Sequence, residues 1–89
     1  MTRVLLDASH DTLDKVYDAL QAQLPLPRHF GRNLDALWDA LTADVRGPVT
    51  IRWRDHAWAR AALGPDYDRL IATLHDVEAA REDFRLELA

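Results

Sequence analysis

The sequence predicts a two-layer α/β sandwich, in which a small three-stranded parallel sheet carries helices packed on one face. The apolar residues change between strand-like and helical spacing in the order strand, helix, helix, strand, helix, helix, strand. Strands that are joined through helical crossovers usually pair in parallel. Two of the three strands alternate apolar with charged residues, whereas strands covered on both faces are continuously apolar. Helices should therefore cover one side of the sheet only, and the pattern leaves the strand order open.

The chain is predicted to form a single domain over residues 1–89, because no repeat, linker or low-complexity tract divides it. Its 48% hydrophobic and 29% charged residues are typical of a globular protein. A chain of this length buries enough surface for one modest core but has little material for a deep, enclosed pocket.

The first third of the chain predicts a strand followed by a helix. Thr2 to Leu6 is a short apolar run suited to a buried strand, and Asp11 can cap the helix that follows. Pro25 and Pro27 end this helix. Its apolar residues follow helical spacing and are Leu13, Val16, Tyr17, Leu20 and Leu24.

The middle of the chain predicts a tight loop at Gly31 and a helix from Leu34 to Thr42, for which Asn33 is a good N-cap. A turn at Gly47-Pro48 leads to the second strand. Its apolar face is expected to carry Val49, Ile51 and Trp53, and its exposed face Thr50, Arg52 and Arg54.

The last third predicts a short helix over His56 to Leu63, broken at Gly64-Pro65, with Pro65 well placed to open a longer helix. The apolar stripe of that longer helix is Tyr67, Leu70, Ile71, Leu74 and Val77. The final strand carries Phe84, Leu86 and Leu88. Trp53 and Trp58 are expected in or near the core.

Charge and cysteine content narrow the classes of function. The net charge is −4 and no basic stripe is present, so direct nucleic-acid binding is disfavoured and a basic partner is expected. The absence of cysteine excludes disulfides and thiolate metal sites, and it favours a reducing, cytoplasmic compartment. The N-terminal apolar run predicts a strand and not a secretory signal, and no run is long enough for a membrane span.

The helix after Asn33 carries a pair of aspartates that folding does not explain. Asp35 and Asp39 are four residues apart, and like charges at that spacing destabilise a helix by about 0.2–0.5 kcal/mol. Asp35 is favoured by the helix dipole in the first turn, whereas Asp39 and Asp44 stand towards its negative end, with no cation four residues after Asp39. Local rules that are broken without compensation tend to mark functional sites. The pattern indicates a compact negative patch that could enter a cationic cleft.

The same segment carries a family resemblance. The run from Leu24 to Thr42, LPLPRHFGRNLDALWDALT, resembles the barstar family, and GRNLDALWD matches its pattern G-x-N-L-D-A-L-W-D. The likeness extends over the whole chain. It implies a barstar-like fold and an inhibitor that blocks the basic active site of a small secreted bacterial ribonuclease with the second helix and the loop before it.

The resemblance also implies roles for single residues. Asp39 would take the place of a substrate phosphate, and Asp35 would pair with another basic group of the enzyme. Trp38 would contribute apolar contact, and Gly31 and Asn33 would shape the loop. Asp76 stands where the family has an acidic contact residue, although an ordinary solvated helix face also explains it.

The sequence departs from the family pattern at the rim of this patch. His29 replaces a stacking tyrosine, and a histidine there can also stack. Arg32 replaces an acidic residue and places a cation beside the patch. Ala43 and Asp44 stand where the family has glycine and tryptophan. The cognate enzyme is therefore expected to be a barnase relative or a different small microbial ribonuclease.

Two other functions stay open at this point. Asp35 and Asp39 could form the carboxylate pair of an enzyme that uses Mg²⁺, or the chain could be a barstar-like interaction module whose partner is not a ribonuclease. The four histidines have no spacing suited to zinc. We expect no catalytic activity, cofactor or metal, no membrane association, a monomer when free, and a 1:1 complex with the partner.

Overall fold

The structure is a computed structural model that describes residues 1–89, and it contains one sheet of three parallel strands. The strands are β1 (Thr2–Leu6), β2 (Val49–Trp53) and β3 (Phe84–Leu88), and β2 lies in the centre of the order β1-β2-β3. The register places Val4 beside Ile51 and Ile51 beside Leu86. The predicted three-stranded parallel sheet is confirmed.

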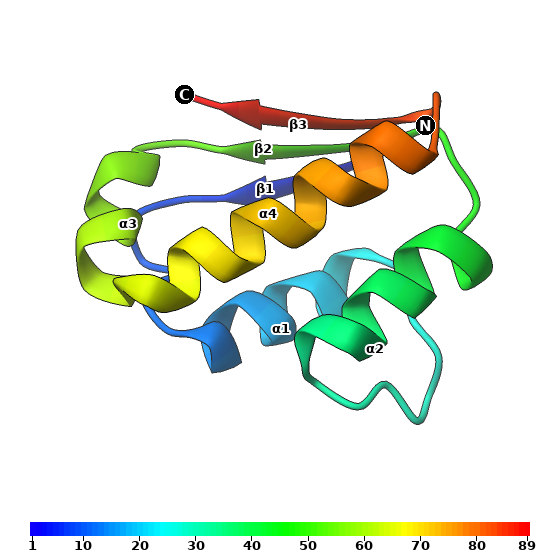
Figure 1. Ribbon diagram of the computed structural model, residues 1–89, viewed down its shortest axis with the longest axis horizontal. Coiled ribbons are helices and arrows are strands. Elements are labelled where there is room, and N and C mark those ends of the chain that lie inside the picture. Colours follow the sequence, from blue (N-terminus) through cyan, green and yellow to red (C-terminus); the bar gives the residue numbers. More distant parts are fainter.

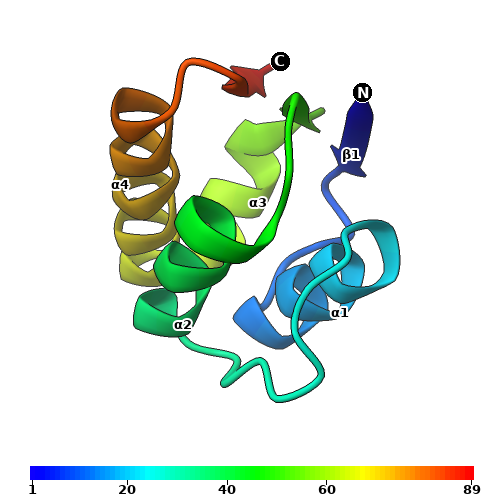
Figure 2. The same cartoon turned by 90° about the vertical axis from the view of Figure 1, so that its right-hand side faces the viewer.

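All helices lie on one face of this sheet, so the two-layer architecture is also confirmed (Figures 1 and 2). They are α1 (Leu13–Gln23), α2 (Leu34–Asp39), α3 (His56–Leu63) and α4 (Pro65–Ala80). A π-helical turn, η1 (Ala40–Asp44), continues α2 without a break. The connection from β1 to β2 runs through α1, α2 and η1, and the one from β2 to β3 through α3 and α4.

The core fills the space between the sheet and the helices. Every one of the 21 buried residues is hydrophobic, and side chains from all three strands contribute. Trp53 is fully buried, as expected, and its indole nitrogen donates to the carbonyl of Asp7 at 3.1 Å. This bond satisfies the one polar group that the ring brings into the core.

The opposite face of the sheet is open to solvent. It presents one row across the strands with Arg3, Thr50 and Arg85, and a second with Leu5, Arg52 and Glu87. The expected exposure of Arg52 and Arg54 is confirmed. The expectation that β1 is buried is wrong for one of its faces, because β1 is an edge strand of a sheet covered on one side and leaves Leu5 52% exposed.

The start of α1 differs from the prediction by one residue. Thr12, and not Asp11, is the N-cap, and its hydroxyl accepts from the backbone N–H of Lys15 at 3.2 Å. Asp11 lies one residue too early for that bond. Its carboxylate instead accepts from Nζ of Lys15 at 2.8 Å.

Trp58 is not a core residue: it is 74% exposed, so that prediction is wrong. Helix α3 buries only Ala59 and Leu63, which are four residues apart and share one face. Trp58 precedes Ala59 by one position, and a step of 100° turns it away from that narrow stripe.

Candidate functional site

The site begins at the loop between α1 and α2. Asn33 caps α2 as predicted: its side-chain oxygen accepts from the backbone N–H of Ala36 at 2.8 Å. The side-chain amide of Asn33 also donates to the carbonyl of Gly31 at 3.3 Å. One side chain therefore sets both the start of α2 and the curvature of the loop before it.

The tight position of this loop is one residue later than expected. Arg32, and not Gly31, has a left-handed backbone, with φ of 52°. Gly31 serves a steric purpose instead. A Cβ there would lie 3.3 Å from Cβ of Ala36 and 3.3 Å from the side-chain amide of Asn33, which is tighter than most real contacts. The absence of a side chain lets the loop approach α2 closely.

The guanidinium of Arg32, the cation expected beside the acidic patch, is directed onto α1. It donates to the side chain of Gln21 and, at 3.0 Å, to the backbone carbonyl of Asp14. It also forms ion pairs with Asp18 at 3.0 Å and Asp14 at 3.6 Å. The counter-ions of Arg32 are therefore the carboxylates of α1, and not those of α2.

The predicted acids Asp35, Asp39, Asp44 and Asp76 are all exposed, and none has a counter-ion in its own chain. This distinguishes them from most other carboxylates of the protein. The carboxylates that do lie within 4 Å of an arginine, lysine or histidine are Asp7, Asp11, Asp14, Asp18, Asp66, Glu78, Asp83 and Glu87. The acidic patch on α2 is thus uncompensated.

Asp39 stands where α2 changes its helical type. The prediction of a continuous α-helix to Thr42 is wrong, because the α-helix ends at Asp39 and residues 40–44 form the wider π-turn. Asp44 therefore lies inside this turn and not beyond the helix. Arg81 stabilises the turn by donating to the carbonyls of Leu41 at 2.6 Å and Val45 at 2.8 Å. Single π-turns of this kind are frequent at functional sites.

A shallow hollow of about 130 Å³ brings part of the predicted site together. Four of its lining residues, His29, Gly31, Asp39 and Asp44, belong to the predicted set. The others are Pro27, Phe30, Ala36 and Ala40. The sequence prediction did not include this second set of four. Two small residues four apart on one helix, Ala36 and Ala40, were the signal that could have predicted a hollow.

The remaining predicted residues lie outside this hollow. Asp35 precedes Asp39 by about one helical turn, so the two share the exposed side of α2. Trp38 is half-buried and packs against the core. Asp76 lies on α4, which packs beside α2. The site is therefore a loop and a short helix, flanked by α4.

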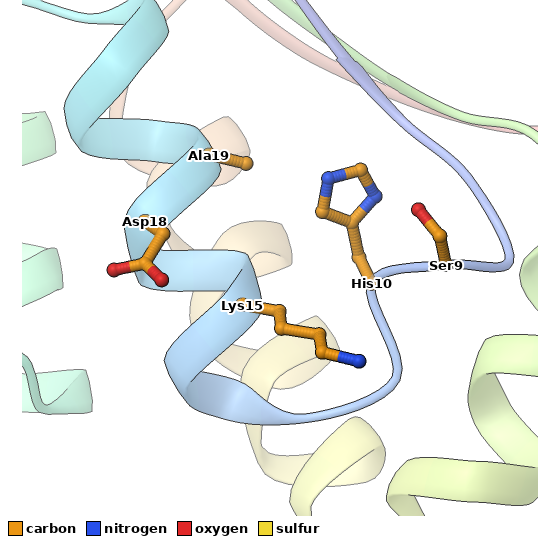
Figure 3. A pocket seen from close by; sticks show the side chains of 5 residues that line it. All are labelled: Ser9, His10, Lys15, Asp18 and Ala19. Atoms are coloured by element: carbon orange, nitrogen blue, oxygen red, sulfur yellow. The ribbon is translucent and has the colours of Figure 1, made fainter.

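A larger hollow of about 470 Å³ lies beside the N-terminal half of α1, and Figure 3 shows its five lining residues. Its polar groups are engaged locally: Nδ1 of His10 accepts from the backbone N–H of Asp7 at 3.0 Å, and Nζ of Lys15 donates to Asp11 at 2.8 Å. The Asp18 side chain points away from His10 (Figure 3). The polar side chains of His10 and Lys15 in this hollow are therefore already hydrogen-bonded within the protein.

Two further features bear on the classes of function. The structure contains no group of three or more histidine, aspartate or glutamate side chains placed to hold a metal ion. None of its helices combines the length and the apolar composition that crossing a membrane requires.

The fold and the site define a class of small α/β proteins in which a short acidic helix is presented to solvent by a packed loop. The chain belongs to the barstar family, described as Barstar (barnase inhibitor), which it matches over residues 1–89. It is also similar to the protein named "Putative ribonuclease inhibitor YrdF" of Bacillus subtilis (strain 168). The two are 28% identical over 88 residues, which cover 97% of each chain.

Proposed function

We propose that this protein inhibits a small secreted bacterial ribonuclease by placing α2 and the loop before it in the basic active site of the enzyme. Family membership and the named relative support a ribonuclease-inhibitor role. The observation that carries the mechanism is the exposure of Asp35, Asp39 and Asp44 without a counter-ion from their own chain. Such a patch gains most of its electrostatic energy only when a cationic partner arrives.

Asp39 acts in this proposal as a substitute for a substrate phosphate. A ribonuclease binds the negative charge of the RNA backbone through cationic side chains, and a carboxylate offers them the same charge. A carboxylate has no phosphodiester bond, so the bound group cannot be cleaved. Asp35, on the same side of α2, pairs with a second basic group of the enzyme.

The hollow beside Asp39 suits a cationic side chain of the enzyme. The carboxylates of Asp39 and Asp44 lie at a recess that also contains Pro27 and Phe30. An arginine or lysine could place its apolar stem along the recess and its charged head between the two carboxylates. His29 stacks at the rim, Trp38 adds apolar contact beside it, and Asp76 makes an outer contact from α4.

The proposal further includes a cytoplasmic protein that is monomeric when free and binds one ribonuclease molecule, either a barnase relative or another small microbial enzyme. The first experiment titrates the purified protein into a panel of small secreted bacterial ribonucleases. A loss of activity that is complete at one equivalent supports inhibition. Full activity of every enzyme at excess protein would favour the alternative of a barstar-like interaction module with another partner.

A Mg²⁺ titration by calorimetry addresses the enzyme alternative. In that alternative, Asp35 and Asp39 form the carboxylate pair that binds the ion. We expect no saturable heat at these residues, and saturable binding that is lost in Asp39→Asn would support a metal-dependent enzyme instead.

The mechanism is tested by two substitutions that remove one negative charge each. Asp39→Asn should weaken inhibition by at least about 2 kcal/mol, or roughly thirtyfold, because it leaves cations of the enzyme buried without a partner. Asp35→Asn should cost less. The matched control is Asp55→Asn, since Asp55 is also exposed and without a counter-ion but precedes α3 at another part of the molecule (Figure 1). Equal inhibition by Asp39→Asn and Asp55→Asn would contradict the mechanism.

A further inference from the structure

We infer that Arg32 is the positioning residue of the binding loop: it fixes residues 25–33 against α1 so that α2 is presented in its binding conformation before a partner arrives. The consequence for binding rests on the proposed function. The clamp itself concerns the free protein and can be tested without any ribonuclease.

The contacts of Arg32 follow one face of α1. Asp14, Tyr17, Asp18 and Gln21 recur at steps of three and four residues, which places them in one stripe along the helix. The guanidinium lies 5.7 Å from the centroid of the Tyr17 ring. Its side chain is 34% exposed, compared with 88% for Asp14 and 71% for Asp18. One loop side chain therefore spans two turns of α1.

Tyr17 joins this clamp to the rest of the loop. Its ring meets the ring of Phe30 edge-on, with centroids 5.7 Å apart and an interplanar angle of 74°. Burial raises the pKa of the Tyr17 hydroxyl, so the ring beneath Arg32 stays neutral at ordinary pH. Phe30 also lines the hollow with Asp39, so the contact of Arg32 with Tyr17 reaches the recognition surface through two aromatic rings.

The backbone of Arg32 is consistent with this role. A left-handed φ of 52° is unfavourable for a residue with a Cβ, and such residues persist where their surroundings over-determine them. Here the contacts of the Arg32 side chain with α1 hold its backbone in this conformation. The next residue, Asn33, caps α2, so a fixed Arg32 fixes the point at which the helix begins.

A loop that is already ordered in the free protein loses less conformational entropy on binding than a mobile loop does. Fixing the loop should therefore tighten binding. The clamp predicts that substitution of Arg32 weakens binding, whereas electrostatics alone predicts the opposite effect. Removal of a cation near an acidic patch should tighten binding to a basic enzyme. Arg28 in the same loop provides the matched control for loop order in the free protein, because it is exposed and its side chain has no hydrogen bond or ion pair.

The first measurement is amide hydrogen exchange in the free protein, by NMR, for the parent, Arg32→Ala, Arg32→Lys and Arg28→Ala. The reporters are the N–H groups of Phe30, which donates to Pro27, and of Ala36, which donates to Asn33. We expect Arg32→Ala to speed their exchange by about threefold to tenfold relative to the core amide of Leu74 in α4, with no change in Arg28→Ala. Arg32→Lys keeps the charge but loses the planar fork, so it should exchange faster than the parent.

The second measurement is inhibition of a ribonuclease that the parent protein inhibits. We expect Arg32→Ala and Arg32→Lys to weaken inhibition by about threefold or more. The control for this measurement is Arg54→Ala, an exposed arginine that follows β2 outside the binding loop, and it should leave inhibition unchanged or tighter. Unchanged loop exchange in both Arg32 variants would overturn the clamp. Faster exchange with unchanged or tighter inhibition would overturn the positioning role. If the parent inhibits no ribonuclease, the proposed function fails, while the exchange measurement still decides whether the clamp exists.

Discussion

Arg81 is the residue that joins the recognition segment to the sheet. Its Nε donates to Asp83 at 2.9 Å, and its Nη1 donates to the carbonyls of Leu41, within η1, and of Val45, which follows η1. Gly47 packs directly against this pair, since a Cβ there would lie only 2.1 Å from a carboxylate oxygen of Asp83. A side chain at position 47 would therefore displace Asp83, and with it the group that orients Arg81.

The Arg81–Asp83 pair predicts a dependence of stability on pH. The side-chain hydrogen bond from Arg81 lowers the pKa of Asp83 from its ordinary value of 3.8. A lowered pKa in the folded state means that the pair stabilises the protein above about pH 3.8 and that this contribution is lost as the pH falls through the lower, folded value. Asp83→Asn should therefore be less stable than the parent at pH 7, and the difference should shrink as the pH falls below 3.8. Urea unfolding of both proteins across this range measures it, and a difference that stays constant with pH would contradict the assignment.

Single residues were predictable from the sequence where short-range rules decide their environment. Asn33 could be identified as a cap because only the three residues after it matter. The exposure of Asp39 followed from helical spacing, which places it away from Leu34, Leu37 and Leu41. Arg32 could not be placed, because a long side chain can reach several elements and its partners on α1 lie 11 to 18 residues away in sequence. Trp58 could not be placed either, because the number of residues that α3 buries depends on tertiary packing.

At the scale of elements, α2 is a short helix that depends on its ends. It has six residues and only Leu37 is buried, so packing and propensity alone provide little stabilisation. Asn33→Ala should lower the free energy of unfolding by about 1 kcal/mol, because it removes the N-cap acceptor for Ala36. Asn33→Asp is the matched control, since it keeps an acceptor and adds a negative charge that the helix dipole favours. Urea unfolding of the three proteins tests this, and equal stability of the parent and Asn33→Ala would contradict the role of the cap.

The type and order of the elements were predictable, but the π-turn was not. Leu34, Leu37 and Leu41 have a spacing that an α-helix satisfies, so the sequence gives no reason to end it at Asp39. The wider turn is stabilised by Arg81, which is 40 residues from Leu41 in sequence. Its consequence for the site, the placement of Asp44 beside Asp39, was therefore not visible in the local pattern.

At the scale of the whole molecule, charge is distributed unevenly around one core. The acidic segment lies on the helical layer, while the open face of the sheet presents Arg3, Arg52 and Arg85. Alternation within the strands predicted the open face. The strand order was not predictable, because right-handed crossovers allow more than one order for three parallel strands. Once the order is β1-β2-β3, both crossovers run over the same face, and the other face stays bare (Figure 2).

This distribution predicts how salt affects association with an inhibited ribonuclease. Opposite charges accelerate the encounter, and their range shortens from about 10 Å at 0.1 M salt to about 3 Å at 1 M. We expect the association rate to fall by about tenfold or more over that range while the dissociation rate changes little. Asp39→Asn should flatten the salt dependence more than Asp55→Asn, because Asp55 precedes α3, which lies at one end of the molecule, and α2 lies away from that end (Figure 1). Stopped-flow mixing at several salt concentrations measures both rates. A salt effect that resides in dissociation, or equal flattening by the two variants, would show that the charge on α2 does not steer the encounter.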